Sequence, residues 1–445
     1  MLKNTTLVGA MFAFGLSGLA AAAEAQTATP TPPPSPSAKA MPGTSPVPKA
    51  SASATPAPTP TPSPTPYKLI TLQGSADAGF SNVSGTSCAR FTNGPLPTPD
   101  TGCPSAGGTS RIFDAGTGPF FDENGGRQLA GPSDFNGSPD LQNANLSATF
   151  NGPFIGGKVE GSFGSDADVI ASNGQSRSGS NLTQAYLQAA RGPVTVLLGK
   201  FETLAGAEYI EAPLNTNYTR SYLFGYAIPF THTGARATYV VNGKISVVVG
   251  ANNGWDDWKF AGKKKTLEGA LLLTPSPNLT WNIQTYNGND FAVPGDSALE
   301  FAPVYTNRML YDSELTVKAT SALTLIGNYD NGTQLADSGT FFPMAAHWNG
   351  FAGYANYAFT PVYGISLRKE TFGDPEGFRT GIPQRLQSNT ATFNYTPGSN
   401  YIFRAEYRLD ASSVPDFTFR GIDPLGEPGR QHQSSVGLEA VVKFP

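Results

Sequence analysis

The chain of 445 residues is poor in the residue types on which soluble enzymes depend. Only 14% of its residues are charged, it holds 3 histidines and 2 cysteines, and its formal net charge is −4. The negative balance excludes the broad basic surface that nucleic-acid binding requires, so we expect no nucleic-acid partner. After the first 25 residues no run of about 20 apolar residues occurs, which excludes a membrane protein built from helices.

Sequence motifs for catalysis and metal binding are also missing. The chain has no G-x-S-x-G elbow and no H-E-x-x-H pair. His232, His347 and His432 each fall at the start of an expected strand, where a structural role explains them. No spaced series of aspartates supports a calcium site. We therefore predict that the protein is not an enzyme and has neither a cofactor nor a metal site.

The N-terminal part of the chain has the features of an export signal followed by a linker. An apolar run ends at Ala23-Glu24-Ala25, which fits the small-x-small pattern of signal-peptide cleavage. The next 40 or so residues are mostly Pro, Thr, Ser and Ala and cannot bury enough apolar surface to fold. The predicted domains are a signal peptide over residues 1–25, a disordered periplasmic linker over 26–66, and one folded domain over 67–445. A linker that contacts peptidoglycan is the alternative to a plain spacer.

The two cysteines, Cys88 and Cys103, lie in one segment rich in Gly, Pro and Ser. In an exported protein such a pair is expected to form a disulfide, which would close the loop and contribute about 3 kcal/mol of stability. Two free thiols are the alternative. Neither cysteine has a histidine or acidic neighbour at a spacing that suits metal binding.

From Tyr67 onward one unit repeats: about ten alternating residues, a tight turn, ten more residues, and a longer polar loop. The last such run, SSVGLEAVVKF, places Leu438 and Val442 on one face and Glu439 and Lys443 on the other. Alternation of lipid-facing and lumen-facing residues is typical of a transmembrane β-barrel. A soluble β-sandwich also alternates, so the connections must decide between the two.

The connections sort by length: seven short turns alternate with eight long loops. Short periplasmic turns and long outer loops are the arrangement of outer-membrane barrels. We therefore predict an all-β fold, a closed antiparallel transmembrane β-barrel of about 16 strands, with both barrel ends on the periplasmic side. The expected strands are 68–80, 141–150, 155–166, 181–190, 193–201, 230–241, 244–253, 264–273, 278–288, 309–319, 322–331, 347–359, 362–371, 385–396, 400–409 and 432–444.

Aromatic residues recur near the ends of these strands, where outer-membrane barrels carry a girdle at each membrane interface. The residues expected in the girdles are Phe80, Phe150, Tyr286, Tyr329, Phe359, Phe393, Tyr395 and Phe444.

One segment, from Glu202 to Pro229, interrupts the alternation without becoming a Gly/Ser-rich loop. It is the third long loop, and a barrel of 16 strands leaves a wide aqueous lumen that a loop can narrow. We expect Leu204, Tyr209, Ile210, Leu214, Tyr222, Leu223 and Phe224 to pack against the barrel wall. The charged residues Glu202, Glu208, Glu211 and Arg220 are expected to face water.

Charges on the lumen-facing side of the strands supply the other half of the expected constriction. They are the bases Arg236, Lys318, Arg368, Arg404 and Arg408 and the acids Glu268, Asp312, Glu314, Glu406 and Glu439. A transverse field between loop acids and wall arginines would then set selectivity. The predicted constriction residues are Glu202, Glu208, Glu211, Arg220, Arg236, Arg404 and Arg408. A solvated lining without a special ring of charge is the alternative.

Several short motifs cluster around this loop. They are Gln184-Ala185-Tyr186, Gly199-Lys200-Phe201, Gly206-Ala207-Glu208, the stretch from Asn215 to Ser221, the stretch from Ile228 to Gly234, and Asn253-Gly254-Trp255-Asp256. Together they resemble the core signature of the OmpL-like family of outer-membrane β-barrel porins. The resemblance covers about 75 residues closely and implies an outer-membrane pore without implying a substrate. Pro445 departs from the aromatic last residue that such barrels usually have.

These observations predict a porin of the outer membrane that lets small hydrophilic solutes or ions diffuse passively. Outer-membrane lipids are its expected surroundings, and a homotrimer is expected by analogy with porins of the same strand number. An adhesin or envelope tether with a plugged barrel is the alternative. The choice of solute and the preference for cations or anions stay open.

Overall fold

The computed structural model describes residues 70–83, 86–87, 140–172, 179–260, 264–293, 304–335, 345–380, 383–414, 417–418 and 431–444. The predicted signal peptide, the linker, and Cys88 and Cys103 lie outside these residues. Within the described residues no helix has the length and apolar character needed to cross a membrane.

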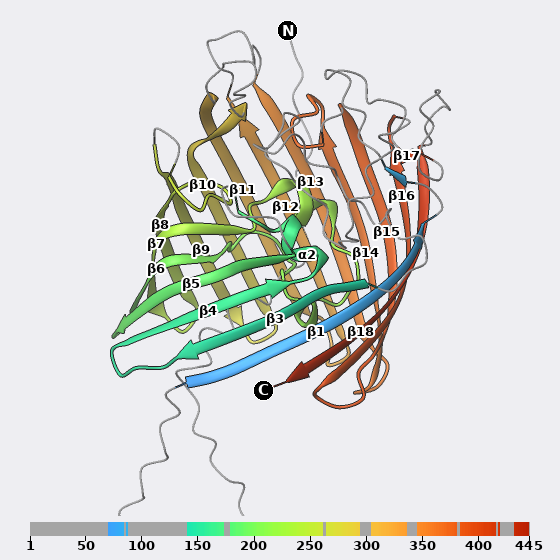
Figure 1. The fold of residues 1–445 in the computed structure, drawn as a ribbon, viewed down its shortest axis with the longest axis horizontal. Coiled ribbons are helices and arrows are strands. Elements are labelled where there is room, and N and C mark those ends of the chain that lie inside the picture. The colour runs from blue at the N-terminus through green and yellow to red at the C-terminus, as the bar shows by residue number, and fades with distance from the viewer. Residues whose placement is uncertain are drawn as a thin grey trace, which may run out of the picture.

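Sixteen antiparallel strands form one closed barrel, in which β1 pairs with β18 to complete the ring (Figure 1). The strands of the ring are β1 (Ile70–Val83), β3 (Asp140–Phe150), β4 (Ile155–Phe163), β5 (Ser180–Arg191), β6 (Val194–Glu202), β7 (Thr231–Asn242), β8 (Ile245–Asn252), β9 (Thr266–Ser276), β10 (Leu279–Val293), β11 (Val304–Lys318), β12 (Leu323–Gln334), β13 (Ala346–Ala358), β14 (Tyr363–Asp374), β15 (Gln384–Tyr395), β16 (Tyr401–Ser412) and β18 (His432–Phe444). The predicted fold class and strand number are confirmed.

Two further strands, β2 (Thr86–Ser87) and β17 (Phe417–Thr418), pair with each other outside the ring. The sequence did not reveal them, because two residues are too few to show an alternating pattern. The described part of the chain has three short helical pieces, namely α2 (Ser165–Val169), the 3₁₀ turn η2 (Ala212–Leu214) and the π-helical turn η3 (Leu223–Ala227).

Closure of the ring satisfies the backbone of every strand. β1 and β18 pair over a continuous register from Gly74 opposite Phe444 to Val83 opposite Ser435. Hydrocarbon offers no water to unpaired N–H and C=O groups, so a spanning sheet must leave no edge. This pairing of the first strand with the last removes the edge.

The strand boundaries agree with the predicted ones to within a few residues, and the largest deviation is at β10 and β11. These strands extend about five residues further into their outer connection than predicted. The extra pairs include Asn289 opposite Asn307 and Phe291 opposite Tyr305. The polar sequence Asn-Gly-Asn-Asp at residues 287–290 is typical of a loop, yet the β-ladder with β11 continues through it.

The outer face of the barrel is apolar. Leu187 and Leu198 are each 60% exposed and Val249 is 59% exposed, as expected for side chains that face lipid. At the short-turn end, Tyr363 stacks on Tyr395 with ring centres 5.0 Å apart, as in an interfacial girdle. Of the predicted girdle residues, Phe150, Phe359, Phe393 and Phe444 are exposed on this face.

Tyr286 is not a girdle residue, and the prediction for it was wrong. Its side chain is fully buried on the lumen side, where its ring stacks on His232 at 4.8 Å. Its hydroxyl accepts a hydrogen bond from the Leu204 backbone N–H at 3.2 Å. Tyr286 was misplaced because it lies near the outer end of the predicted strand 278–288, whereas it lies in the middle of β10, and the period-two parity of the strand points it inward.

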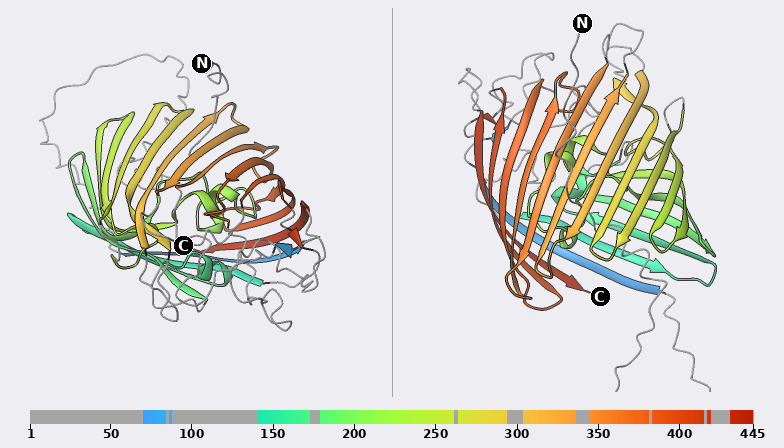
Figure 2. Two further views of the ribbon diagram at one scale, coloured as in Figure 1. Left: turned by 90° about the horizontal axis from the view of Figure 1, so that it is seen from above. Right: turned by 180° about the vertical axis from the view of Figure 1, so that it is seen from behind.

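The connection between β6 and β7, residues 203–230, is hereafter called the L3 segment. Seen from above, the ring of strands surrounds it (Figure 2). It contains η2 and η3 and otherwise has no regular secondary structure. Its contacts with the barrel wall define the candidate site.

The assignment of faces predicts opposite responses to charge at adjacent residues of β5. Leu187→Arg places a guanidinium in lipid and should lower the free energy of unfolding by about 2 kcal/mol. Gln188→Arg, one residue further, points to the lumen and should cost less than about 1 kcal/mol. Urea unfolding of both variants in lipid vesicles measures the difference, and equal costs would mean that the faces are wrongly assigned.

Candidate pore constriction

The backbone of the L3 segment finds hydrogen-bond partners on the barrel wall instead of in a β-ladder. Buried backbone N–H and C=O groups need such partners, because leaving them unpaired costs free energy. The Glu406 carboxylate on β16 accepts bonds from the N–H groups of Tyr218 and Thr219 at 2.7 and 3.0 Å. The Glu370 carboxylate on β14 accepts one from the Tyr222 N–H at 2.5 Å. Wall acids therefore satisfy donors of L3.

Wall arginines satisfy acceptors of L3 in the same way. Arg368 on β14 donates to the carbonyls of Thr219 and Arg220 at 2.6 and 3.2 Å. Arg408 on β16 donates to the same Arg220 carbonyl at 2.7 Å. Arg404 lies four residues before Arg408 on the same face of β16 and donates to the Ala212 carbonyl at 3.3 Å. The charged wall thus holds L3 by its main chain.

Glu208 and Arg220 were expected to face water, and this expectation was wrong. Glu208 is buried and forms an ion pair with Arg368 at 2.7 Å. Arg220 is fully buried and donates to three carbonyls of its own segment, those of Tyr209 at 2.8 Å, Ile210 at 3.1 Å and Tyr218 at 3.2 Å. Both charges serve the internal structure of L3 and its attachment, because each satisfies groups that water cannot reach.

The predicted wall arginines are paired with wall acids. Arg236 on β7 lies 2.7 Å from Glu268 on β9. Arg404 pairs with Glu439 on β18, and Arg408 lies 2.7 Å from Asp410. Each of these arginines therefore has a carboxylate beside it on the wall, which balances part of its charge there.

Apolar side chains of L3 pack on the inner wall. Tyr222, Leu223 and Phe224 are each at most 3% exposed, as predicted, whereas Leu214 is 55% exposed and was wrongly placed in this group. A Cβ added at Gly350 on β13 would meet the Leu223 side chain at 2.7 Å, so the wall has glycine where Leu223 approaches. Close packing and main-chain hydrogen bonds therefore act on the same part of L3.

Indole nitrogens and aromatic rings complete this contact. Trp348 on β13 is fully buried and donates from its Nε1 to the Ala227 carbonyl at 3.0 Å. Tyr226 stacks on Phe372 of β14 with ring centres 5.7 Å apart. The second half of L3 is thereby fixed against β13 and β14.

Three carboxylates gather where L3 faces β4 and β6. Ligand oxygens of Glu160, Glu202 and Glu211 all lie within 4.8 Å of one another, and these three residues are hereafter called the acidic cluster. The Lys158 ammonium lies 2.5 Å from Glu160, and the Gln184 amide donates to Glu202 at 2.8 Å. Among the described residues, these three acids form the group whose carboxylate oxygens lie close enough to one another to attract a cation.

The structure therefore brings two predicted residues, Glu202 and Glu211, together and separates them from Glu208. Glu202 is the last residue of β6, not part of the loop as predicted. Both side chains are partly accessible, whereas Glu160 is 2% exposed. Burial, followed by the charges of Glu202 and Glu160, raises the pKa of Glu211 well above its ordinary value. Glu211 consequently keeps its proton to a higher pH than an exposed glutamate does.

The sequence interpretation missed Lys158 and Glu160, which are two residues apart on β4 and face the lumen together. Period-two parity on β4 was enough to find them, because Val159 between them is 56% exposed. It also missed Glu370, which accepts from L3. No sequence signal shows which wall residue faces which part of L3, because those pairs cross the barrel.

A closed ring of 16 strands with an apolar outer face and a lumen lined by charged pairs is the structure of an outer-membrane porin. The family model for OmpL-like proteins, beta-barrel porin-2, matches residues 116–444. The chain belongs to this family, as its sequence resemblance indicated. No curated protein sequence is found to match it.

Solved structures of outer-membrane proteins have the same fold at low sequence identity. The outer membrane channel DcaP of Acinetobacter baumannii is 14% identical, with a TM-score of 0.54 over 84% of this chain and 97% of that one. An anion-selective porin from Comamonas acidovorans is 12% identical, with a TM-score of 0.51 over 84% and 99%. OprB of Pseudomonas putida is 12% identical, with a TM-score of 0.50 over 85% and 94%. The protein is thus a porin-like barrel of the outer membrane.

The attachment of L3 predicts a strong effect of Arg368→Ala. This change leaves Glu208 buried without its cation, leaves Glu370 with Arg408 alone, and removes two bonds to L3 carbonyls, so we expect a loss of about 3 kcal/mol in stability. L3 should become accessible to protease while the barrel strands stay intact. Lys318→Ala, an exposed residue on β11, is the matched control. An Arg368→Ala barrel whose L3 segment resists protease like the parent protein would contradict this attachment.

Proposed function

We propose that the protein is a passive diffusion porin in which L3 narrows the lumen and the acidic cluster borders the remaining path. The observation that supports this most is the contrast in charge pairing. Arg236, Arg404 and Arg408 each pair with a wall carboxylate, whereas the three acids of the cluster share the one ammonium of Lys158. Small hydrophilic solutes or ions would move down their gradients, and no chemistry on them is involved.

The charge balance of the cluster favours cations. Three carboxylates stand against one ammonium, that of Lys158, so the cluster is net negative whenever its acids are ionised. Negative charge at a narrow, water-filled passage raises the local concentration of cations and repels anions. The Comamonas acidovorans porin of similar fold is described as anion-selective. At 12% identity that likeness concerns the fold alone, and we propose the opposite preference here.

Reversal potentials of the refolded protein in a planar lipid bilayer under a salt gradient test this preference. The parent protein should be cation-selective, and the double change Glu202→Gln with Glu211→Gln should move the reversal potential toward zero. Glu376→Gln, which alters an outer-loop acid beside His347, is the control and should have no effect. A parent protein that prefers anions would refute the role of the cluster.

The pH dependence of selectivity follows from Glu211. Because its pKa is raised, this carboxyl keeps its proton as pH rises past the range where glutamates ordinarily titrate, and gains charge only above it. Cation preference should therefore increase with pH over a range well above pH 4.5, and Glu211→Gln should flatten that rise. A preference that is constant from pH 5 to pH 9 in the parent protein would contradict this assignment.

An envelope tether with a plugged barrel is the second candidate function, and one observation favours it. L3 residues including Tyr222, Leu223 and Phe224 form a buried apolar cluster with Trp348 and Phe372 inside the ring. A cluster of this kind fills part of the lumen. The porin proposal requires that it leaves an aqueous path on the side of the acidic cluster.

The remaining expectations extend this proposal. A homotrimer is consistent with the trimer form of the Vibrio cholerae outer membrane protein OmpT, a solved structure of similar fold. We propose that residues 26–66 form a periplasmic linker, with peptidoglycan as its candidate contact, and that Cys88 and Cys103 form a disulfide in an outer loop.

A further inference from the structure

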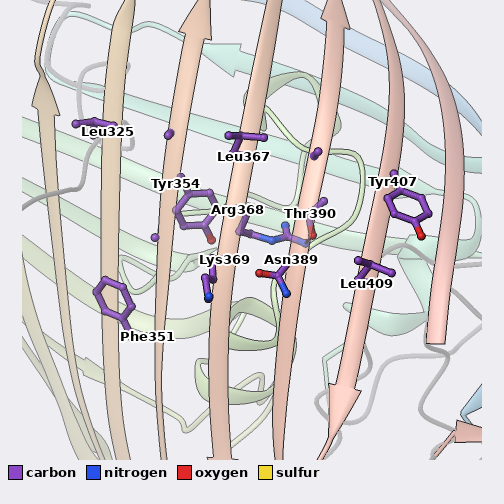
Figure 3. A pocket seen from close by; sticks show the side chains of 13 residues that line it. Leu325, Phe351, Tyr354, Leu367, Arg368, Lys369, Asn389, Thr390, Tyr407 and Leu409 are labelled. Carbon is purple, nitrogen blue, oxygen red and sulfur yellow. Dashed lines mark hydrogen bonds between the residues drawn. The ribbon is translucent and has the colours of Figure 1, made fainter. Parts of the chain in front are cut away.

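The outer face of the barrel has a hollow of about 560 Å³ across β12 to β16 (Figure 3). It is hereafter called the outer groove. Most of its lining comes from two adjacent rows of outward-facing residues, and the buried Tyr354, Arg368 and Thr390 also contribute to it. One row runs through Gly353, Lys369, Asn389 and Leu409, which are partners in register on β13 to β16. The hollow therefore lies on the surface that faces lipid, not in the lumen.

Short side chains make the groove deep. Gly353, Ala355 and Ala391 form its floor, between the larger Phe351 on one side and Tyr407 on the other. Glycine is not required at position 353 by crowding, because an added Cβ would meet the Phe351 ring at 3.4 Å and the Ile326 carbonyl oxygen at 4.0 Å, both ordinary contact distances. The hollow thus results from the small side chains at these positions, and a larger residue at position 353 would fit in it.

A polar pair interrupts the apolar outer face at this groove. Lys369 and Asn389 are exposed and lie opposite each other on β14 and β15 (Figure 3). Lys369 is six residues above Tyr363, so with the usual rise and tilt it lies about 15 Å above the periplasmic girdle, within an apolar band about 25 Å tall. This depth belongs to the outer half of the membrane. A lone ammonium there is unfavourable unless an anion accompanies it.

The strand residues whose side chains the structure describes supply no such anion on the outer face. Among strand residues with described side chains, every aspartate and glutamate except Glu202 is buried, and Glu202 belongs to the acidic cluster. No outward strand position of a second copy would therefore bring a described carboxylate to Lys369. The groove combines an apolar hollow with a cationic edge, and the surrounding membrane contains anionic head groups that suit this edge.

We propose that the outer groove binds an anionic lipid of the outer leaflet. Its phosphate would accept hydrogen bonds from the Lys369 ammonium and the Asn389 amide, and an acyl chain would fill the hollow over Gly353, Ala355 and Ala391. The flexible stem of Lys369 lets its ammonium reach up toward a head group while its methylenes stay on apolar surface. The assignment is independent of whether the lumen conducts.

Native mass spectrometry of the full barrel, released from detergent after addition of purified lipid A, tests this site. The parent protein should retain lipid A, and Lys369→Met should retain about fivefold less, since one lysine contributes roughly that factor to anionic-lipid binding. Gly353→Leu should also reduce retention by filling the hollow. Lys244→Met, which removes an exposed lysine from the β7–β8 turn, is the control and should bind like the parent.

The other outcomes overturn the proposal. Equal retention by the parent protein, Lys369→Met and Gly353→Leu would show that lipid binds elsewhere. Loss of oligomers in Gly353→Leu, with lipid retention unchanged, would assign the groove to a second copy of the chain. Competition by inorganic phosphate alone would show a phosphate site without an acyl-chain requirement. If Gly353→Leu fails to fold, the Lys369→Met comparison still decides.

Discussion

The main chain of the L3 segment is held by charged side chains of the barrel wall, and the rest of the interior depends on this interaction. A segment of this length with almost no regular structure has many backbone groups that need partners. Glu370 and Glu406 accept from its N–H groups, while Arg368, Arg404 and Arg408 donate to its carbonyls. These wall residues therefore act mainly as structural hydrogen-bonding groups. Their charged groups are largely occupied by the bonds to the L3 main chain.

This use of the wall charges changes which residues are left to influence a solute. Arginines that a simple count of lumen charges would treat as a basic surface are buried beside carboxylates, as Arg236 is beside Glu268. The acidic cluster is only partly compensated, by Lys158. In the proposed passage, the electrostatic potential therefore depends on the acidic cluster and Lys158, because the wall arginines already have carboxylates beside them.

Charged side chains are distributed differently on the outer face of the barrel and in the lumen. Strand carboxylates with described side chains are buried inside the barrel or gathered in the acidic cluster, so the lipid-facing surface carries no negative charge of its own there. Lys369 stands out on that surface because it has an exposed ammonium within the apolar band and a hollow beside it. The two faces of β14 thus carry adjacent bases with different roles: Arg368 attaches L3, and Lys369 faces the membrane.

The fold could be predicted from the sequence almost completely, because a period of two residues and the sorting of turns by length are local signals. All sixteen strands of the ring were placed in this way. The site was predictable only in part. The sequence showed where the alternation is interrupted and indicated that Glu202 and Glu211 belong to the candidate site. It did not show that Glu208 is buried against Arg368. Residues 160 positions apart meet there across the lumen, and one sequence contains no information on that register.

The most direct test of this account is the single-channel conductance of the refolded protein in a planar lipid bilayer. Under the proposed function, L3 is held against β13 to β16 and an aqueous path runs beside the acidic cluster, so we predict stepwise openings that persist at low voltage. A folded barrel, identified by its heat-modifiable mobility, that never conducts would contradict the account and show that L3 closes the lumen.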